Sequence, residues 1–262
     1  MRNLCFFLTA TFLLISCKKE NITNNTSVGL PVVQAYLIPN NIITVKIYQQ
    51  KNITDTAQYG VPIKSLQIYI SDGSKKVLLT ESAAGIYTYT DESFLVAGTT
   101  YTLNFKYSTY NVSAKTIMPL KPLNFATALS TIHLSTTSGG PSTTVLDRLS
   151  WDNPDTLNHV LVFLNADEKD FPANSFGSYS QPYNFEINTN RSSYYNITQR
   201  IFPYYGPYQV ILFSVNQEYI DLMTGNTNSS TSSNLTNIQT NIINGFGIFT
   251  AMQADTVSLN VF

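Results

Sequence analysis

Cysteine and charge are both scarce in this chain. It has two cysteines in 262 residues, and 12% of its residues are charged, against about 25% in an average soluble domain. Asn, Ser and Thr supply the polarity instead, a bias that is typical of extracellular β-proteins. The formal net charge is −1, so the chain lacks the basic face of nucleic-acid-binding proteins. We therefore expect no nucleic-acid partner.

Histidine is rare as well, and the acidic residues form no recognisable site. His133 and His159 are the only imidazoles, and no metal-ligand spacing accompanies them, so we interpret both as surface or strand residues. The stretch WDNPDT (151–156) lacks the spacing of a calcium loop and is explained by an Asx-type turn. The stretch ADEKD (166–170) could cleave glycosides only with two acids at a set separation, and a solvated loop is the simpler interpretation. The sequence therefore predicts no catalytic residue, metal or cofactor.

The start of the chain resembles a bacterial lipoprotein signal. An apolar run from Leu4 to Ile15 follows Arg2, and it is too short to cross a bilayer as a helix. Leu14-Ile15-Ser16-Cys17 has the Leu-x-small-Cys order of a lipobox. This resemblance implies that residues 1–16 are removed and that Cys17 carries a diacylglycerol and an acyl chain such as palmitate. Each buried CH₂ contributes about 0.8 kcal/mol, so several chains make a stable anchor.

The alternative to lipidation is a chance cysteine near the end of an ordinary secretory signal. In the lipoprotein interpretation Cys5 is lost with the signal, so the mature chain has neither a free thiol nor a disulfide. Residues 17–29 have almost no apolar content after the cysteine and are predicted to form a flexible tether.

Residues 30–118 are predicted to form an immunoglobulin-like β-sandwich. Apolar residues alternate in ITVKI (43–47) and in LQIYI (66–70), which is typical of strands with one buried face. Asp72-Gly73 predicts a hairpin turn with glycine at positive φ. Gly98 followed by Tyr101 at a strand entrance resembles the tyrosine corner of such sandwiches.

Residues 119–144 are predicted to be a linker or loop, because prolines and a Gly/Ser/Thr-rich stretch interrupt the strand pattern. Residues 145–262 are predicted to form a second β-sandwich, with Trp151 as a core residue rather than a ligand platform. The S-x-x-Q order from Ser214 to Gln217 predicts a capping box and one short helix that stops at Gly225. The expected fold class is therefore all-β, with two β-sandwich domains and one short helix in the second.

Several segments together resemble the lipoproteins of Bacteroidetes that are grouped as domain of unknown function 4249. They are the lipobox, PVVQAYL (31–37), GIYTYTDESFLVAGTTYTL (85–103), VILFSVNQEYIDLM (210–223) and NIINGFGIF (241–249). The last is similar to the closing motif N-I-x-G-G-x-G-x-F of the family, with Asn244 where a glycine is common. The resemblance implies an outer-membrane lipoprotein, often encoded beside a TonB-dependent transporter, without a known activity. We expect Gly245 and Gly247 of this motif to allow a bulge or a close backbone contact.

A tyrosine-rich stretch, SSYYNITQRIFPYYGPYQV (192–210), is a candidate for partner binding. Its prolines keep part of it out of a central strand, and exposed aromatic rings contribute large contact area at low entropy cost. Core packing is the competing interpretation. The candidate partner-binding residues are Tyr194, Tyr195, Tyr204, Tyr205 and Tyr208.

Three Asp-Thr-apolar triplets are candidates for modification. Extracytoplasmic proteins of Bacteroidetes that resemble this one are O-glycosylated at such triplets, which places the acceptors at Thr56, Thr156 and Thr256. The alternative is that Asp-Thr pairs simply favour turns and caps.

Two functions remain in view. The first is a non-enzymatic accessory subunit, lipid-anchored at the cell-surface side of the outer membrane, that associates with an outer-membrane β-barrel such as a TonB-dependent (SusC-like) transporter and assists capture, transport or assembly. The second is an independent cell-surface lipoprotein that binds glycan or peptide in adhesion. An enzyme is a distant third, because the residues offer no catalytic constellation.

Overall fold

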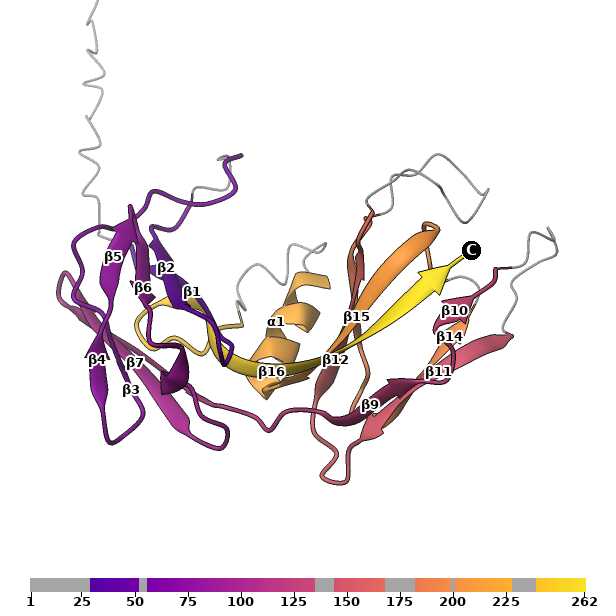
Figure 1. Cartoon of the computed structure of the whole chain (residues 1–262). Helices are drawn as coiled ribbons and strands as arrows, with labels where there is room; N and C mark the ends of the chain where they lie inside the picture. The colour runs from indigo at the N-terminus through magenta and orange to yellow at the C-terminus, as the bar shows by residue number, and fades with distance from the viewer. Residues whose placement is uncertain (1–28, 52–55, 135–143, 168–181, 199–200, 228–238) are drawn as a thin grey trace, which may run out of the picture.

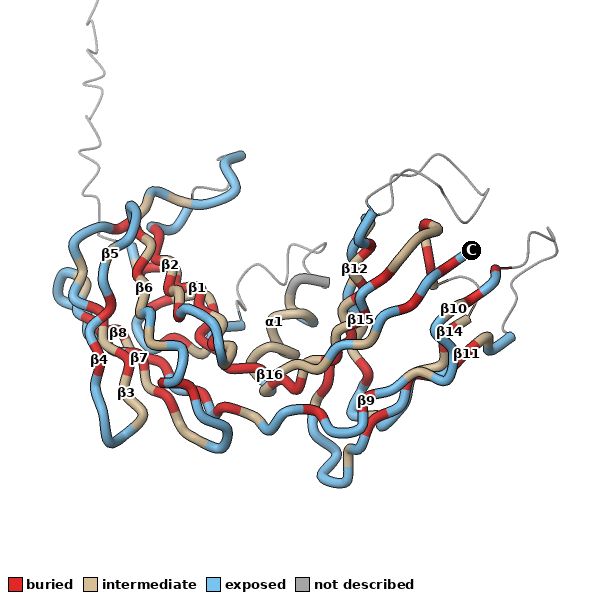
Figure 2. The backbone as a smooth tube through the Cα atoms, in the orientation of Figure 1, coloured by how far each residue is buried: buried red, intermediate tan, exposed pale blue. Residues whose placement is uncertain are grey.

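The computed structural model describes residues 29–51, 56–134, 144–167, 182–198, 201–227 and 239–262. Strands dominate these residues, with one α-helix and one 3₁₀ turn among them (Figure 1). The strands form two β-sandwich units that lie side by side, so the all-β fold class predicted from the sequence is confirmed. Buried residues line the facing sheets of each unit (Figure 2).

The first unit packs a four-stranded sheet, in the order β4-β3-β7-β8, against strands β1, β2, β6 and β5. Its elements are β1 Val32–Leu37, β2 Ile43–Tyr48, β3 Tyr69–Ser71, β4 Lys76–Leu78, β5 Thr80–Ala83, β6 Ile86–Tyr89, η1 Glu92–Phe94, β7 Thr100–Tyr107 and β8 Tyr110–Ile117. In β1 and β7 every second residue is buried, as the period of two in the sequence predicts.

The second unit packs the three-stranded sheet β14-β11-β9 against β13, β12, β15 and the end of β16. Its elements are β9 Leu123–Thr127, β10 Thr131–Ile132, β11 Val145–Asp152, β12 His159–Asn165, β13 Phe185–Asn188, β14 Tyr194–Thr198, β15 Gly206–Val215, α1 Gln217–Thr227 and β16 Phe246–Val261. Trp151 is buried in this core against Phe125, which confirms its interpretation as a core residue.

Strand β16 belongs to both units. Residues Phe246–Ala251 pair in parallel with β1, and Met252–Val261 pair antiparallel with β15. Within the described residues, one nine-stranded sheet therefore runs through both units, and Phe249 and Ala251 are core residues of the first unit. The ranges 30–118 and 145–262 remain predictions as domain bounds. Phe249 and Ala251, which lie in the predicted second range, complete the core of the first unit.

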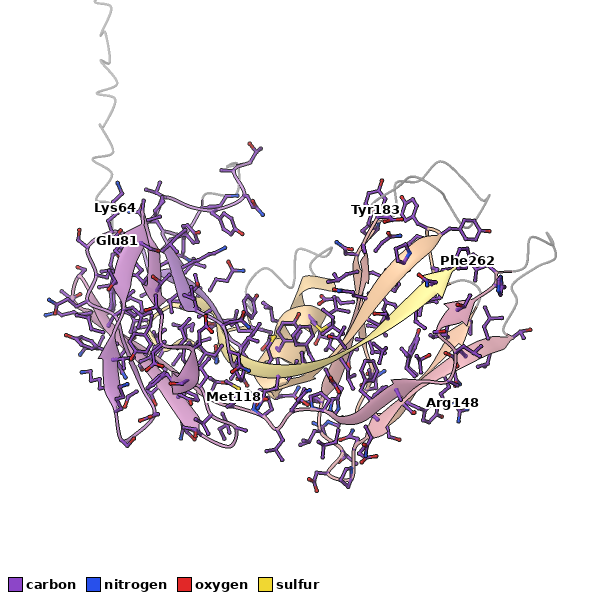
Figure 3. All side chains as sticks on the ribbon, viewed as in Figure 1. Lys64, Glu81, Met118, Arg148, Tyr183 and Phe262 are labelled. Atoms are coloured by element: carbon purple, nitrogen blue, oxygen red, sulfur yellow. The ribbon has the colours of Figure 1, made fainter. Side chains whose placement is uncertain are left out.

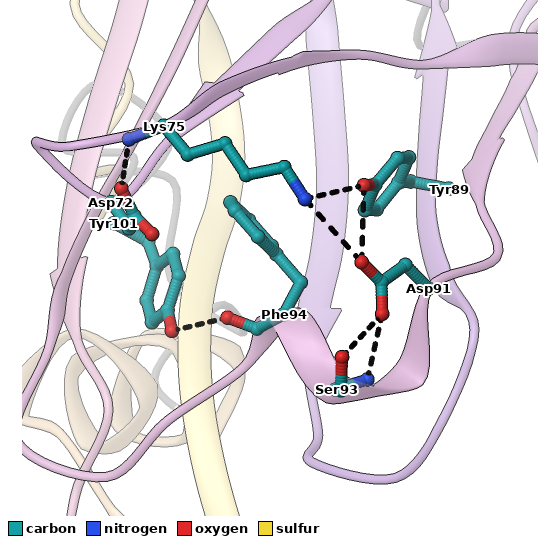
Figure 4. A network of polar contacts seen from close by, with 7 residues as sticks. All are labelled: Asp72, Lys75, Tyr89, Asp91, Ser93, Phe94 and Tyr101. Atoms are coloured by element: carbon teal, nitrogen blue, oxygen red, sulfur yellow. Dashed lines mark hydrogen bonds and ion pairs between the residues drawn. The ribbon is translucent and has the colours of Figure 1, made fainter.

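Local turn chemistry follows the sequence closely. Asp72 Oδ1 accepts from the N–H groups of Ser74 and Lys75, and Gly73 has a φ of +94° between β3 and β4, so the predicted hairpin is confirmed. Tyr101 is buried, and its hydroxyl donates to Phe94 O at 2.9 Å (Figure 4). The same hydroxyl accepts from Val96 N at 2.7 Å. This is the predicted tyrosine corner.

A polar clasp beside the tyrosine corner joins the two sheets of the first unit. Lys75 Nζ lies 3.2 Å from Tyr89 Oη and 3.4 Å from the Asp91 carboxylate, and it also lies over the Phe94 ring (Figure 4). Hydrogen bonds from Ser93 lower the pKa of Asp91, and the bond to Tyr89 raises the pKa of Lys75. Both groups are solvent-exposed, so their stabilising effect is small.

The helix is present, but its predicted capping box is wrong. Ser214 lies in β15, and its hydroxyl contacts Nε2 of buried His159 at 3.1 Å, so it cannot cap the helix. The helix begins at Gln217 and continues past Gly225 to Thr227. Asn216 therefore holds the position before the first turn, and its side chain bonds to the first unit instead of to the helix.

Candidate functional site

Helix α1 lies on the outer face of the long sheet, between the two units (Figure 1). It covers Val160, Val215 and Met252, which are buried beneath it. Seven partly buried apolar side chains surround this contact and form a surface that we name the α1 saddle. They come from both units and from the helix itself: Tyr36, Ile38, Val162, Phe213, Tyr219, Ile220 and Met223.

Tyr219 links the helix to the sheet on both sides of the saddle. Its ring meets Tyr36 of β1 edge-on at 6.2 Å, and its hydroxyl donates to Glu186 Oε2 of β13 at 2.9 Å. Burial and the nearby Glu186 charge raise the pKa of Tyr219 well above its ordinary value. The hydroxyl therefore stays protonated at neutral pH and remains a hydrogen-bond donor.

Asn216 joins the two units at the start of the helix. Its Nδ2 lies 2.7 Å from Ile117 O and 3.0 Å from Thr116 Oγ1, both at the end of β8, and 3.2 Å from Ala251 O of β16. One side chain of the second unit thus contacts the sheets on both sides of the first core. This arrangement fixes the position of α1 relative to the first unit.

Glu218 completes this junction. Its Oε1 accepts from Thr116 Oγ1 at 2.7 Å and from Thr250 Oγ1 at 3.2 Å. Both threonines are buried, and Thr116 Oγ1 also accepts from Ala251 N. A carboxylate in the first turn is favoured by the helix dipole, so Glu218 stabilises the helix start and the contact between units together.

The other side of the helix start is tied to the second unit. Gln217 Oε1 accepts from Asn158 Nδ2 at 3.1 Å and from Arg191 Nη2 at 3.2 Å, while Gln217 Nε2 donates to Asp221 at 2.9 Å. The helix is thus held from both units. Its partly buried apolar side chains are consequently held on a rigid base.

The tyrosines predicted as partner contacts do not gather on the surface. Tyr204 and Tyr208 are buried, and Tyr208 donates to Tyr204 O at 2.9 Å. Tyr195 and Tyr205 pack against the second core. Only Tyr194 of these five has an exposed ring, which stacks with Arg148 at 4.6 Å. Tyr204 and Tyr208 are therefore buried residues rather than partner contacts, because the Tyr208 ring lies in the second core and the Tyr204 ring stacks on Tyr183.

The predicted modification sites lie in different places. Cys17, the expected lipidation site, is outside the described residues. Thr56, Thr156 and Thr256 are all exposed, on the loop after β2, in the turn after β11 and on β16. Each of these residues is therefore accessible to solvent, as an acceptor must be.

The two histidines lie in different settings, one buried and one exposed. His159 is buried between β12 and β15, beside Trp151, and burial lowers the pKa of its ring. His133 is exposed and lies against the ring of Phe262. A turn is present at residues 153–156, where Thr156 N donates to Asn153 O at 3.3 Å. Asn153 Oδ1 accepts from Leu157 N at 2.8 Å, four residues on, so its side-chain bond is not that of the predicted Asx-type turn. In the described part of the chain, no three His, Cys, Asp or Glu side chains gather to hold a metal ion.

The closing motif is a structural element of the first unit. Gly247 has a φ of +97°, and a Cβ at this position would lie 1.9 Å from the Val33 carbonyl oxygen, which confirms the predicted close backbone contact. Asn244 has a φ of +56°, a conformation that glycine adopts freely and asparagine tolerates. The exchange of glycine for asparagine at this motif position therefore keeps the backbone conformation.

The α1 saddle was not predicted, although the sequence contains a signal for it. The run VILFSV (210–215) in β15 is apolar without alternation, which is typical of a strand that is covered on both faces. One face of β15 packs into the second core, and the other lies under α1.

No helix among the described residues is long and apolar enough to cross a membrane.

Comparisons with known proteins place these features in a family. A family model described as "Domain of unknown function (DUF4249)" matches residues 21–258. No curated protein matches the chain. Among solved structures, the crystal structure of the FN1–FN3 domains of chicken CNTN1 is similar over 72% of this chain and 61% of that one, with 14% identity and a TM-score of 0.27. This chain thus spans less than two thirds of that structure, and so weak a likeness supports no argument about function.

Proposed function

The chain belongs to the DUF4249 family, and from this premise we propose that it is a lipid-anchored, non-enzymatic accessory subunit of an outer-membrane β-barrel. Cys17 carries the lipid in this proposal, and residues 18–29 tether the folded units at the cell-surface side of the outer membrane. The barrel is a transporter of the TonB-dependent (SusC-like) kind, which the subunit assists in capture, transport or assembly. The resemblance of the sequence to Bacteroidetes lipoproteins supports this choice of partner.

The α1 saddle is the observation that carries the proposal. Its aromatic and aliphatic side chains are half-buried in the isolated chain, and residues of this kind are enriched at protein interfaces. Hydrogen bonds from both units hold the helix beneath them, so little conformational entropy is lost when a partner covers the surface. We therefore place the contact with the barrel at Ile220 and Met223.

Affinity purification tests the partner. A tagged full chain, extracted from its native membrane with a mild detergent, is expected to recover one large barrel protein in stoichiometric amount. The double variant Ile220→Glu/Met223→Glu is expected to lose this partner, because it places two charges in an apolar contact. The matched control Leu157→Glu changes a 41% exposed apolar residue outside the saddle and should retain it. Circular dichroism establishes that each variant is folded.

The anchor is tested separately. Replacement of Cys17 by alanine removes the thiol that would carry the lipid, so the variant is expected to leave the membrane fraction. If it stayed there as firmly as the wild type, the anchor would have to lie elsewhere in the chain or in the partner.

The runner-up function is a surface lipoprotein that binds glycan or peptide without a barrel. An open groove lined by amide side chains on the first unit favours it. Recovery of the lone lipoprotein after gentle extraction, together with affinity for a glycan or peptide, would support this function over the first.

O-glycosylation at Thr56, Thr156 and Thr256 is part of the proposal for a surface-exposed protein. The intact mass of the native protein is expected to exceed the mass of the lipidated polypeptide. The triple variant with valine at these positions should lose the added mass. Equality of the native mass and the polypeptide mass would contradict the modification.

A further inference from the structure

An open groove of about 630 Å³ lies on the first unit, where the chain leading into β3 separates from β7. One side is lined by Ser65, Leu66, Gln67 and Tyr69, and the other by Asn104, Phe105, Lys106 and Ser108, with Asn111 and Val112 of β8 next to them. We name this feature the β3–β7 fork. It is distant in sequence from the α1 saddle, and none of the residues that form the junction takes part in it.

The strand register explains what the fork exposes. Among the described residues, β3 and β7 pair at Ser71↔Thr102, Ile70↔Leu103 and Tyr69↔Asn104, and the pairing ends there. If this register continued by two residues, Gln67 would pair with Lys106, but both residues line the groove instead.

Main-chain groups face this groove. Tyr107 and Tyr110 pair across a two-residue turn, so the antiparallel alternation directs the N–H and C=O groups of Lys106 away from β8 and toward the fork. The N–H and C=O groups of Tyr69 face β7. Gln67 lies two residues earlier, so in an extended chain its N–H and C=O groups point to the same side. The fork therefore offers donors and acceptors of a sheet edge on both sides, as a strand partner requires.

Hydrogen bonds to the rest of the first unit hold the fork open. Ser65 N donates to Glu81 Oε2 at 2.8 Å, and Leu66 N donates to the buried Tyr87 hydroxyl at 3.1 Å. Leu79 N donates to Ile68 O at 2.9 Å. Residues 65–68 are thus tied to β4, β5 and β6 and are held away from β7.

The walls of the fork are polar and carry positive charge. The amides of Gln67, Asn104 and Asn111 make no side-chain hydrogen bond within the described part of the chain and can bind an added ligand. Lys106 lines the groove, and Lys76 Nζ lies 4.1 Å from the centroid of the Tyr69 ring. Lys64 precedes the fork, near Glu81 (Figure 3), whose two carboxylate oxygens accept backbone N–H groups. Lys64, Lys76 and Lys106 outnumber this one carboxylate, so the charge around the fork is positive.

We propose that the β3–β7 fork is a peptide-binding slot that receives an extended, acidic segment of a partner polypeptide as an added strand. Main-chain hydrogen bonds to Gln67 and Lys106 supply the pairing, as in β-strand addition to a sheet edge. Acidic side chains of the segment pair with the lysines. Beyond the Tyr69–Asn104 pair, each wall offers about four residues of extended chain, which sets the length of the bound segment.

Selection from a random dodecapeptide phage library tests the slot with the full chain. Peptides that contain acidic residues are expected to be enriched. Their Kd is expected to rise at least tenfold in Lys106→Glu, because the substitution reverses the charge at the slot. The control Lys115→Glu makes the same change on exposed β8 outside the groove and should leave the Kd within twofold. On peptide binding, the amides of Gln67 and Lys106 are expected to exchange with solvent at least tenfold more slowly.

Three outcomes overturn the proposal. They are a library that yields no binder, selected peptides that bind Lys106→Glu as tightly as the wild type, and binding without protection of the Gln67 and Lys106 amides. Binding of maltohexaose at the same residues without any selected peptide would assign the groove to glycan instead. The inference is independent of the barrel, because the saddle variant Ile220→Glu/Met223→Glu is expected to bind the selected peptides normally.

Discussion

Asn241 pairs its side chain with the backbone of Phe249 in both directions. Its Nδ2 donates to the Phe249 carbonyl at 2.7 Å, and its Oδ1 accepts from the Phe249 N–H at 3.0 Å. The carboxamide thus takes the place of a neighbouring strand beside β16. Next to it, Ile243 exchanges two backbone hydrogen bonds with Ser113, and Asn244 Nδ2 donates to Asn111 O. The motif therefore covers the free edge of β8, which would otherwise be open to pairing with another chain.

Replacement of Asn241 by alanine tests this role. Phe249 is fully buried, so its N–H and C=O groups would lose their partner without access to water. We expect the free energy of unfolding to fall by about 1–3 kcal/mol, as measured by urea denaturation. Asn260→Ala, at an exposed position of β16, should change the free energy of unfolding by less than about 0.5 kcal/mol. Equal losses in both variants would contradict the pairing role.

A pair of glycine substitutions separates backbone strain from steric overlap. Gly73 and Gly247 have similar φ values, +94° and +97°, but a Cβ at Gly73 meets nothing within 4 Å, whereas a Cβ at Gly247 would overlap the Val33 carbonyl. Gly73→Ala is expected to cost only the conformational strain of about 1–2 kcal/mol. Gly247→Ala should cost clearly more, because β1 and β16 must move apart. Thermal unfolding of the two variants provides the comparison, and similar losses would show that the contact is relaxed.

Local features of the fold could be predicted because their chemistry lies within a few residues. The Asp72-Gly73 turn needs only the aspartate side chain and a glycine at positive φ. Tyr101 needs only the carbonyl and amide groups of residues 94 and 96. The alternation in β1 and β7 reports one buried face for the same reason.

Long-range features could not be read from the sequence. Val32 pairs with Phe246 across more than two hundred residues, and both strands are apolar enough to suit several partners. The capping box failed for a related reason. The Ser214 hydroxyl contacts His159, and the Asn216 side chain donates to Ile117 O. Both partners are remote in the sequence, so the local pattern could not reveal them.

The tyrosine corner is expected to contribute measurably to stability. Tyr101→Phe removes the hydroxyl that joins Phe94 O and Val96 N but keeps the buried ring. We expect a loss of about 1–3 kcal/mol in the free energy of unfolding, because a buried acceptor is left unpaired. Tyr110→Phe removes a hydroxyl from a 37% exposed ring and should be nearly neutral. Urea denaturation of both variants checks the difference.

Asn216 is expected to control the angle between the two units. Asn216→Ala removes the bonds to Ile117 O and Thr116 Oγ1, so the first unit should move more freely about β16. Spin labels at Lys64→Cys and Arg148→Cys, which lie in different units (Figure 3), report this movement as a broader distance distribution in pulsed electron resonance. The chain for this measurement carries Cys17→Ala and lacks residues 1–16, so that only the two labels react. An unchanged distribution would show that Asn216 does not control the angle and that β16, with the contacts of Glu218 and Tyr219, is sufficient to fix it.

The buried imidazole of His159 predicts a loss of stability in mild acid. Burial lowers the pKa of this ring below its ordinary value of 6.5, so the unfolded chain takes up a proton before the folded chain does. Stability is therefore unaffected by His159 above about pH 7 and falls as pH decreases through and below about 6.5. Urea denaturation between pH 5.5 and 8 measures this slope. His159→Gln keeps an amide for Ser214 but cannot titrate, so its profile should be flatter. A His159→Gln slope equal to that of the wild type would assign the pH dependence to other groups.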